Sequence, residues 1–254
     1  MNFYKIVLQY HGTRYLGWQV QPKESGLTLQ GELNRVLEEI SKSPDVRSLG
    51  SGRTDAGVHA LGQVVKIGIP LEIDPKNLIK ALNVNLPSDM NVLSCEVSDE
   101  KFMPTTDARS KEYHYRFTMT RYPSAFQGSL IANCPFELDL NLMNEACKML
   151  VGEHDFSNYF CEGTEVSSYV RQIYKASFEI ESAQIDFLPT HYVFKIEGNG
   201  FLKQMVRLLV GALWNVGRGK VSLDDFKRSL QASRVKRLGP VAPAEGLYLF
   251  RVNY

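Results

Sequence analysis

Residues 50–60 read Gly50-Ser51-Gly52-Arg53-Thr54-Asp55-Ala56-Gly57-Val58-His59-Ala60. Three glycines break any helical pattern here and let the backbone turn and approach a ligand closely. Arg53 offers a planar guanidinium suited to phosphate, and Asp55 is a carboxylate in the same segment. The segment predicts a loop with two interpretations: an active-site loop, or a turn in which Asp55 hydrogen-bonds its own backbone.

The sequence around this loop predicts an alternation of strands and helices. Apolar residues recur on one face over 28–41, and Thr28 can cap that helix. Period-two patterns predict strands over 4–10, 63–69 and 91–97, and Asp74-Pro75 opens a helix to about residue 83. The first part of the chain is therefore expected to run strand, helix, strand, helix, strand.

The rest of the chain repeats this order with longer connections. Strands are expected over 112–119, 170–181, 191–198 and 247–252, and helices over 139–151, 201–216 and 222–233, with Gly152 capping the first of these helices. This order predicts an α+β fold of two halves with a largely antiparallel sheet. We place the halves at residues 1–104 and 105–254.

Composition is that of a globular protein. The 254 residues are 44% hydrophobic and 22% charged, enough to bury a large core. No charged leader precedes the first strand, and no run approaches the roughly 18 apolar residues of a membrane span, so we expect a cytoplasmic protein without a membrane partner. The four cysteines are too widely spaced for a zinc knuckle or a disulfide framework, and no histidine cluster predicts a metal.

Charge is unevenly distributed along the chain. Residues 199–240 hold nine basic and two acidic residues, a net charge of +7, whereas the whole chain carries only +1. Such a segment favours a polyanionic partner. Solvated helix faces would explain about half of these cations equally well.

Two further residues have side chains suited to a catalytic site. Arg207 interrupts an apolar helical face, so it requires a carboxylate or phosphate partner, or must reach solvent at the helix edge. If it pairs with Asp55, the pairing would keep that carboxylate ionised. Tyr113 lies in a predicted strand, where its ring could stack on a base or simply pack in the core.

The segment Gly52–Ala60 resembles the signature of the tRNA pseudouridine synthase A (TruA) family. Other blocks resemble that family in the same order: Tyr10–Gln19, Leu29–Leu33, Lys111–Tyr115, Gly152–Ser157, Asn199–Leu202, Met205–Arg207 and Ala242–Leu249. The resemblance covers essentially the whole chain. It implies the pseudouridine synthase fold, with two ferredoxin-like or RRM-like halves that share a mixed, largely antiparallel sheet and a central active-site cleft.

The resemblance also implies roles for individual residues. Asp55 would be the catalytic nucleophile, Arg207 its basic partner, and Tyr113 the ring that packs on the base and serves proton transfer. Arg53 would help to hold the flipped nucleotide, and Leu247 would line the pocket. No cofactor is implied, because the reaction breaks the N-glycosidic bond of a uridine and rejoins the uracil through carbon.

The family further implies a homodimer that grips the elbow and anticodon arm of tRNA and modifies uridines in the anticodon stem-loop. The basic segment suits that role, and its RNA-binding candidates are Lys203, Arg218, Lys220, Arg234, Lys236 and Arg237. The chain departs from the family at Phe102-Met103-Pro104-Thr105, where Phe-His-Ala-Arg is usual, and at Leu208, where Asn is usual.

Two other functions are compatible with parts of the sequence. A catalytically silent RNA-binding protein could keep the sheet and the basic surface, but it would have little need of Asp55 and Arg207 together. A glycoside or nucleoside hydrolase could use an aspartate nucleophile, yet it normally needs a second carboxylate as acid, for which Glu162 is the nearest candidate.

Overall fold

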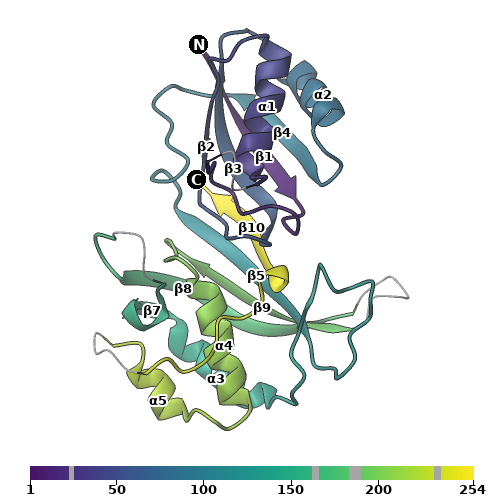
Figure 1. Ribbon diagram of the computed structural model, residues 1–254. Helices are drawn as coiled ribbons and strands as arrows, with labels where there is room; N and C mark the ends of the chain where they lie inside the picture. Colours follow the sequence, from purple (N-terminus) through teal and green to yellow (C-terminus); the bar gives the residue numbers. More distant parts are fainter. Residues whose placement is uncertain (23–25, 162–165, 183–189, 232–235) are drawn as a thin grey trace. The chain divides into compact units, whose positions relative to one another are not determined.

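The computed structural model describes residues 1–22, 26–161, 166–182, 190–231 and 236–254, and within them ten strands and five α-helices (Figure 1). The chain divides into two compact units. Unit 1 is Met1–Arg109 with Tyr248–Tyr254, and unit 2 is Ser110–Leu247. None of the helices in the described ranges is long and apolar enough to cross a membrane. The fold is α+β, as the sequence predicts.

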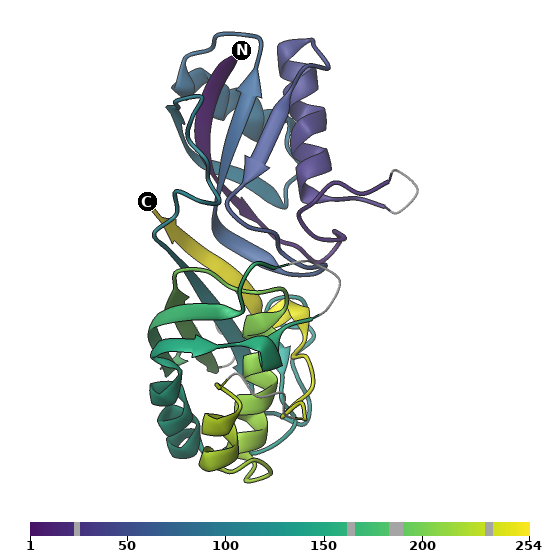
Figure 2. The same cartoon turned by 90° about the vertical axis from the view of Figure 1, so that its left-hand side faces the viewer.

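Unit 1 is a sheet covered by two helices on one face (Figures 1 and 2). The strand order is β4 (Met90–Val97), β1 (Asn2–Tyr10), β3 (His59–Ile69) and β10 (Leu247–Asn253), with β2 (Arg47–Gly50) also paired to β3. The helices are α1 (Leu29–Ser41) and α2 (Pro75–Asn85). Alternate residues of β1 and the apolar face of α1 are buried, which confirms the predicted pattern.

The predicted caps start the helices of unit 1. Thr28 accepts a hydrogen bond from the Gly31 N–H at 3.2 Å, and the Asp74 carboxylate accepts from the Lys76 and Asn77 N–H groups. A side-chain acceptor at this position satisfies N–H groups that have no partner within the helix.

β10 joins unit 1 although it ends the chain. It pairs with β3 in parallel, with Tyr248 opposite His59 and Leu249 opposite Ala60. The sequence-based division at residue 104 assigned the last strand to the second half. A pairing between such distant segments has no local signal, because each strand shows only its own alternation.

Unit 2 is an antiparallel sheet in the order β5 (Ser110–Thr118), β9 (His191–Gly198), β8 (Val170–Glu181) and β7 (Gly152–Asp155), with the short β6 (Ala132–Asn133) parallel to β5. Its helices are α3 (Leu140–Leu150), α4 (Met205–Gly217) and α5 (Leu223–Arg228); α3 and α4 lie side by side (Figures 1 and 2). The core between sheet and helices is aromatic: Tyr115 and Phe117 meet Trp214 edge to face at 5.9 and 5.5 Å.

Several element boundaries differ from the sequence-based expectation. α4 begins at Met205 instead of Phe201, because Gln204 adopts a left-handed conformation with φ 60°. α5 ends at Arg228, and β3 begins at His59. Gly152 was expected to cap the helix before it, but the cap of α3 is Val151. Gly152 is the next residue, has φ +118°, and begins β7.

Candidate active site

Asp55 lies in the loop 51–58, which connects β2 to β3. The start of this loop is held by Gln63 of β3, whose side chain is fully buried. The Ser51 hydroxyl donates to Gln63 Oε1 at 2.7 Å, and Gln63 Nε2 donates to the Gly52 carbonyl at 2.7 Å. One side chain thus fixes two consecutive residues of the loop.

The middle of the loop is fixed at Thr54, next to Asp55. Thr54 Oγ1 lies 2.8 Å from the Tyr10 hydroxyl in a buried contact, and its carbonyl accepts from the Trp18 N–H at 3.0 Å. A turn follows, in which the Val58 N–H donates to the Asp55 carbonyl at 3.2 Å and Gly57 has φ +78°. The half-buried Asp55 side chain is therefore carried by an ordered backbone, the kind of positioning that a catalytic carboxylate would need.

A second loop, residues 11–18, packs against this one. Gly12 has no room for a side chain, because a Cβ there would lie 1.9 Å from the Val58 carbonyl oxygen. Gly17 has φ +97°, and its Cβ would lie 2.6 Å from the Thr54 carbonyl oxygen. In the sequence, this segment was distinguished only by its resemblance to the family. Its two glycines were the available signal that backbones meet here.

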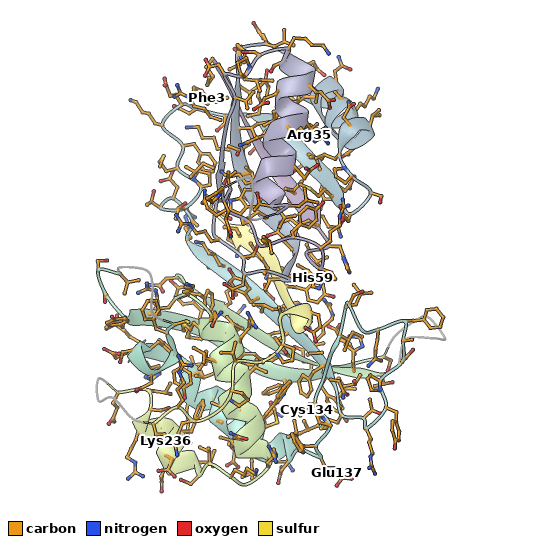
Figure 3. All side chains as sticks on the ribbon, in the orientation of Figure 1. Phe3, Arg35, His59, Cys134, Glu137 and Lys236 are labelled. Carbon is orange, nitrogen blue, oxygen red and sulfur yellow. The ribbon has the colours of Figure 1, made fainter. Side chains whose placement is uncertain are left out.

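His59, labelled in Figure 3, connects the two loops to β10. The Gly12 N–H donates to His59 Nδ1 at 3.0 Å, so the ring proton of neutral His59 is on Nε2. The ring stacks on Tyr248 at 4.7 Å and contacts His11 at 4.6 Å. The C-terminal strand therefore supports the Asp55 loop through a histidine that sequence reasoning missed as a positioning residue.

The segment that departs from the family pattern also contacts the loop. Thr105 Oγ1 donates to the Gly50 carbonyl at 3.2 Å, and the Tyr254 hydroxyl donates to the Pro104 carbonyl at 2.7 Å. Thr105 thus contacts Gly50, the residue directly before the Asp55 loop, and Tyr254 holds the neighbouring Pro104.

We expect Gln63→Leu to lower the free energy of unfolding by about 2 to 4 kcal/mol, because it leaves the Ser51 hydroxyl and the Gly52 carbonyl buried without this partner. Thermal and urea unfolding would measure the change. Gln231→Leu, at an exposed position, is the matched control. A loss below about 0.5 kcal/mol, within the range of ordinary surface changes, would contradict the assigned role of Gln63.

Unit 2 carries the other predicted site residues. Tyr113 is on β5, is 8% exposed, and meets the Phe201 ring edge to face at 5.0 Å. Leu247 is buried at the start of β10. Arg207, the third residue of α4, is half-buried.

Arg207 holds the segment that leads to Leu247. Its Nε donates to the Ala242 carbonyl at 2.7 Å, and the Ala242 N–H donates to the Arg207 carbonyl at 3.1 Å. One and two helical turns further on, Gly211 contacts the Pro240 backbone and Asn215 Nδ2 donates to the Leu238 carbonyl. This face of α4 therefore fixes residues 238–242. Because Asp55 belongs to unit 1 and Arg207 to unit 2, their pairing stays a prediction.

The predicted RNA-binding residues lie on unit 2. Lys203, Lys220, Lys236 and Arg237 are exposed, and Lys236 is labelled in Figure 3. Arg218 is half-buried, with its guanidinium 3.6 Å from the Phe136 ring centre. Arg234 and the alternative acid Glu162 lie outside the described residues.

Comparison with known proteins gives matches along the whole chain. The family model described as tRNA pseudouridine synthase matches residues 6–102 and 146–254. The tRNA pseudouridine synthase A of Geobacillus sp. (strain WCH70) is 38% identical over 250 residues, 98% of this chain and 97% of the relative. The proteins of that name from Lacticaseibacillus casei (strain BL23) and Exiguobacterium sibiricum are 37% and 39% identical, over 100% of this chain and 100% and 97% of theirs.

Proposed function

Because the chain belongs to the tRNA pseudouridine synthase family, we propose that Asp55 carries out the isomerisation of uridine to pseudouridine in the anticodon stem-loop of tRNA. The observation that carries this proposal is the geometry of the loop 51–58. The half-buried Asp55 carboxylate stands on a loop whose backbone is held by Gln63, by Tyr10 through Thr54, and by the loop 11–18.

The reaction rearranges bonds without an oxidant or reductant. The C1′–N1 glycosidic bond breaks, a C1′–C5 bond forms, the hydrogen on C5 leaves as a proton, and N1 takes up a proton. Asp55 can serve through attack on the sugar carbon, attack on the base, or initial proton removal. Each route requires an ionised carboxylate at a fixed position, which an ordered loop provides.

The target base must leave the RNA stack before this carboxylate reaches it. Extrusion costs a few kcal/mol, which stacking and backbone contacts must offset. Tyr113 supplies the ring for the flipped base, Leu247 an apolar wall, and Arg53 a cation for the nucleotide. Arg207 is the basic partner of Asp55. The detached uracil is retained by a partly apolar surround, which Tyr113 and Leu247 suit.

The wider assignment follows the family resemblance. The enzyme acts in the cytoplasm as a homodimer, and exposed Lys203, Lys220, Lys236 and Arg237, with Arg218 and Arg234, contact the anticodon arm and elbow of tRNA. These residues are all positively charged, whereas the whole chain has a net charge of only +1, and this supports their assignment to an RNA-binding surface.

Mapping pseudouridine at single-nucleotide resolution in unmodified tRNA transcripts tests the proposal. We expect product confined to the anticodon stem-loop. Free uracil in place of pseudouridine would favour a hydrolase, and tight tRNA binding without any product would favour a catalytically silent RNA-binding protein.

Binding to tRNA should depend steeply on salt, and neutralising Arg234, Lys236 and Arg237 together should reduce that dependence. Each lost phosphate contact makes the plot of the logarithm of the binding constant against the logarithm of salt concentration less steep by about one. Filter binding over a KCl series measures it. Replacing the exposed Lys42, Lys76 and Lys80 of unit 1 provides the control. Equal slopes for both triple variants would remove residues 234–237 from the RNA surface.

A further inference from the structure

Asp89 holds the loop 11–18 from the turn between α2 and β4. Its carbonyl accepts from the His11 N–H at 2.9 Å, at the start of the loop. Its carboxylate Oδ1 accepts from the Tyr15 hydroxyl at 2.7 Å and from Arg14 Nη2 at 3.1 Å, and Oδ2 accepts from Arg14 Nε. One aspartate therefore fixes this loop through its own backbone and through its side chain.

The Tyr15 hydroxyl is the buried part of this anchor, and Tyr15 as a whole is only 1% exposed. Burial, and then the hydrogen bond to Asp89, raise the pKa of Tyr15 to about 12, so the hydroxyl keeps its proton at neutral pH and donates it to the carboxylate. Arg14 Nη2 donates to the same hydroxyl oxygen at 3.1 Å. An enclosed ring with a fixed hydroxyl also fixes the backbone that carries it.

The backbone of Tyr15 contacts the Asp55 loop. The Tyr15 carbonyl accepts from the Gly57 N–H at 3.3 Å, two residues after Asp55. Three residues further along, the Trp18 N–H donates to the carbonyl of Thr54, the residue directly before Asp55. The chain is therefore held on both sides of Asp55, and Tyr15 makes one of these two contacts.

We propose that Asp89 and Tyr15 are positioning residues of the reaction, which hold the Asp55 carboxylate in place through the loop 11–18. The inference rests on the proposed function, because it takes Asp55 as the catalytic group. A shift of about 1 Å at a catalytic group can cost about a hundredfold in rate. A hydrogen bond at Tyr15 can therefore affect the reaction by acting through the backbone of the Asp55 loop.

Tyr15→Phe removes the hydroxyl and keeps the buried ring. We expect the single-turnover rate of pseudouridine formation at saturating tRNA to fall about tenfold or more, while tRNA binding in a filter assay changes by less than about twofold. Tyr4→Phe is the matched control, because Tyr4 is 2% exposed and its hydroxyl donates to the Ile73 carbonyl at 3.0 Å in the same unit. It should lower the melting temperature to a similar extent and keep the wild-type rate.

The Asp89 variants test whether the two side chains act together. Asp89→Ala should lower the rate as much as Tyr15→Phe, and the double variant should lower it no further, because both act through one hydrogen bond. Asp89→Asn should recover most of the rate, since its Oδ1 still accepts from the Tyr15 hydroxyl. Additive losses of rate in the double variant would contradict this coupling.

Amide hydrogen exchange measured by NMR tests the same anchor independently of activity. Tyr15→Phe should speed exchange at Gly57 and Val58 about tenfold, the effect of losing one hydrogen bond, and Tyr4→Phe should leave it unchanged. Unchanged exchange in Tyr15→Phe, or equal reaction rates in the two Phe variants, would overturn the inference. A wild type that forms no pseudouridine would refute the proposed function, and the exchange result would still decide whether Asp89 and Tyr15 hold the loop.

Discussion

Replacing Asp55 with Asn should abolish pseudouridine formation, with a fall in rate of about a thousandfold or more, while tRNA binding changes little. Asn has the shape of Asp but cannot act as a nucleophile or a base at neutral pH. Losing a residue that acts directly on the reacting atoms typically costs several powers of ten in rate. The backbone contacts of loop 51–58 use Thr54, Gln63 and the Asp55 carbonyl, so the substitution leaves them intact.

Single-turnover product formation on a tRNA transcript and filter binding measure the two quantities. Asp45→Asn, an exposed aspartate in the turn before β2, is the control and should keep the wild-type rate. A rate for Asp55→Asn within tenfold of the wild type would remove Asp55 from the chemistry and return the loop to the interpretation of a structural turn.

Gly211→Ala should lower the free energy of unfolding by about 3 kcal/mol, the range of overpacked interiors. A Cβ at this position would lie 1.8 Å from the Pro240 carbonyl oxygen, and the contact is with backbone that cannot rotate away. Helix propensity alone predicts the opposite sign, because Ala is favoured over Gly in a helix by about 1 kcal/mol. The sign of the change therefore decides whether packing of residues 238–242 on α4 governs this site.

Thermal unfolding measures this effect, with Gly128→Ala as the control, since the nearest atom to a Cβ there is 3.9 Å away. Activity should fall as well, because Arg207 and Ala242 hold the same segment one turn earlier on α4. A Gly211→Ala protein as stable as the wild type would contradict the close packing of these backbones.

Local patterns predicted most of the secondary structure. The helix at 28–41 was predictable because its cap and its apolar face both lie within the segment. The strand at 170–181 was predictable because strand-forming residues run through it without interruption. β2 was missed, since Arg47–Gly50 has too few residues to show a period. The predicted start of α4 was wrong. Phe201 and Leu202 are apolar residues that precede the helix, and apolarity alone does not distinguish such residues from the first turn of a helix.

The candidate site was only partly predictable for a similar reason. Asp55, Tyr113 and Arg207 are chemically conspicuous in the sequence, so they could be named from it. Gln63, Tyr10 and the loop 11–18 act through contacts with Ser51, Thr54 and Val58, which have no signature in a single segment. The expected pairing of Arg207 with Asp55 stays a prediction, whereas its contact with the Ala242 carbonyl had no signal in the sequence.

Release of the C5 hydrogen tests the central claim most directly, because forming the C1′–C5 bond must expel it. tRNA labelled with tritium at C5 of uracil should release tritium to water in proportion to the modified uridines when incubated with this protein, and none with Asp55→Asn. Absence of release by the wild type, or equal release by both proteins, would contradict pseudouridine formation at Asp55.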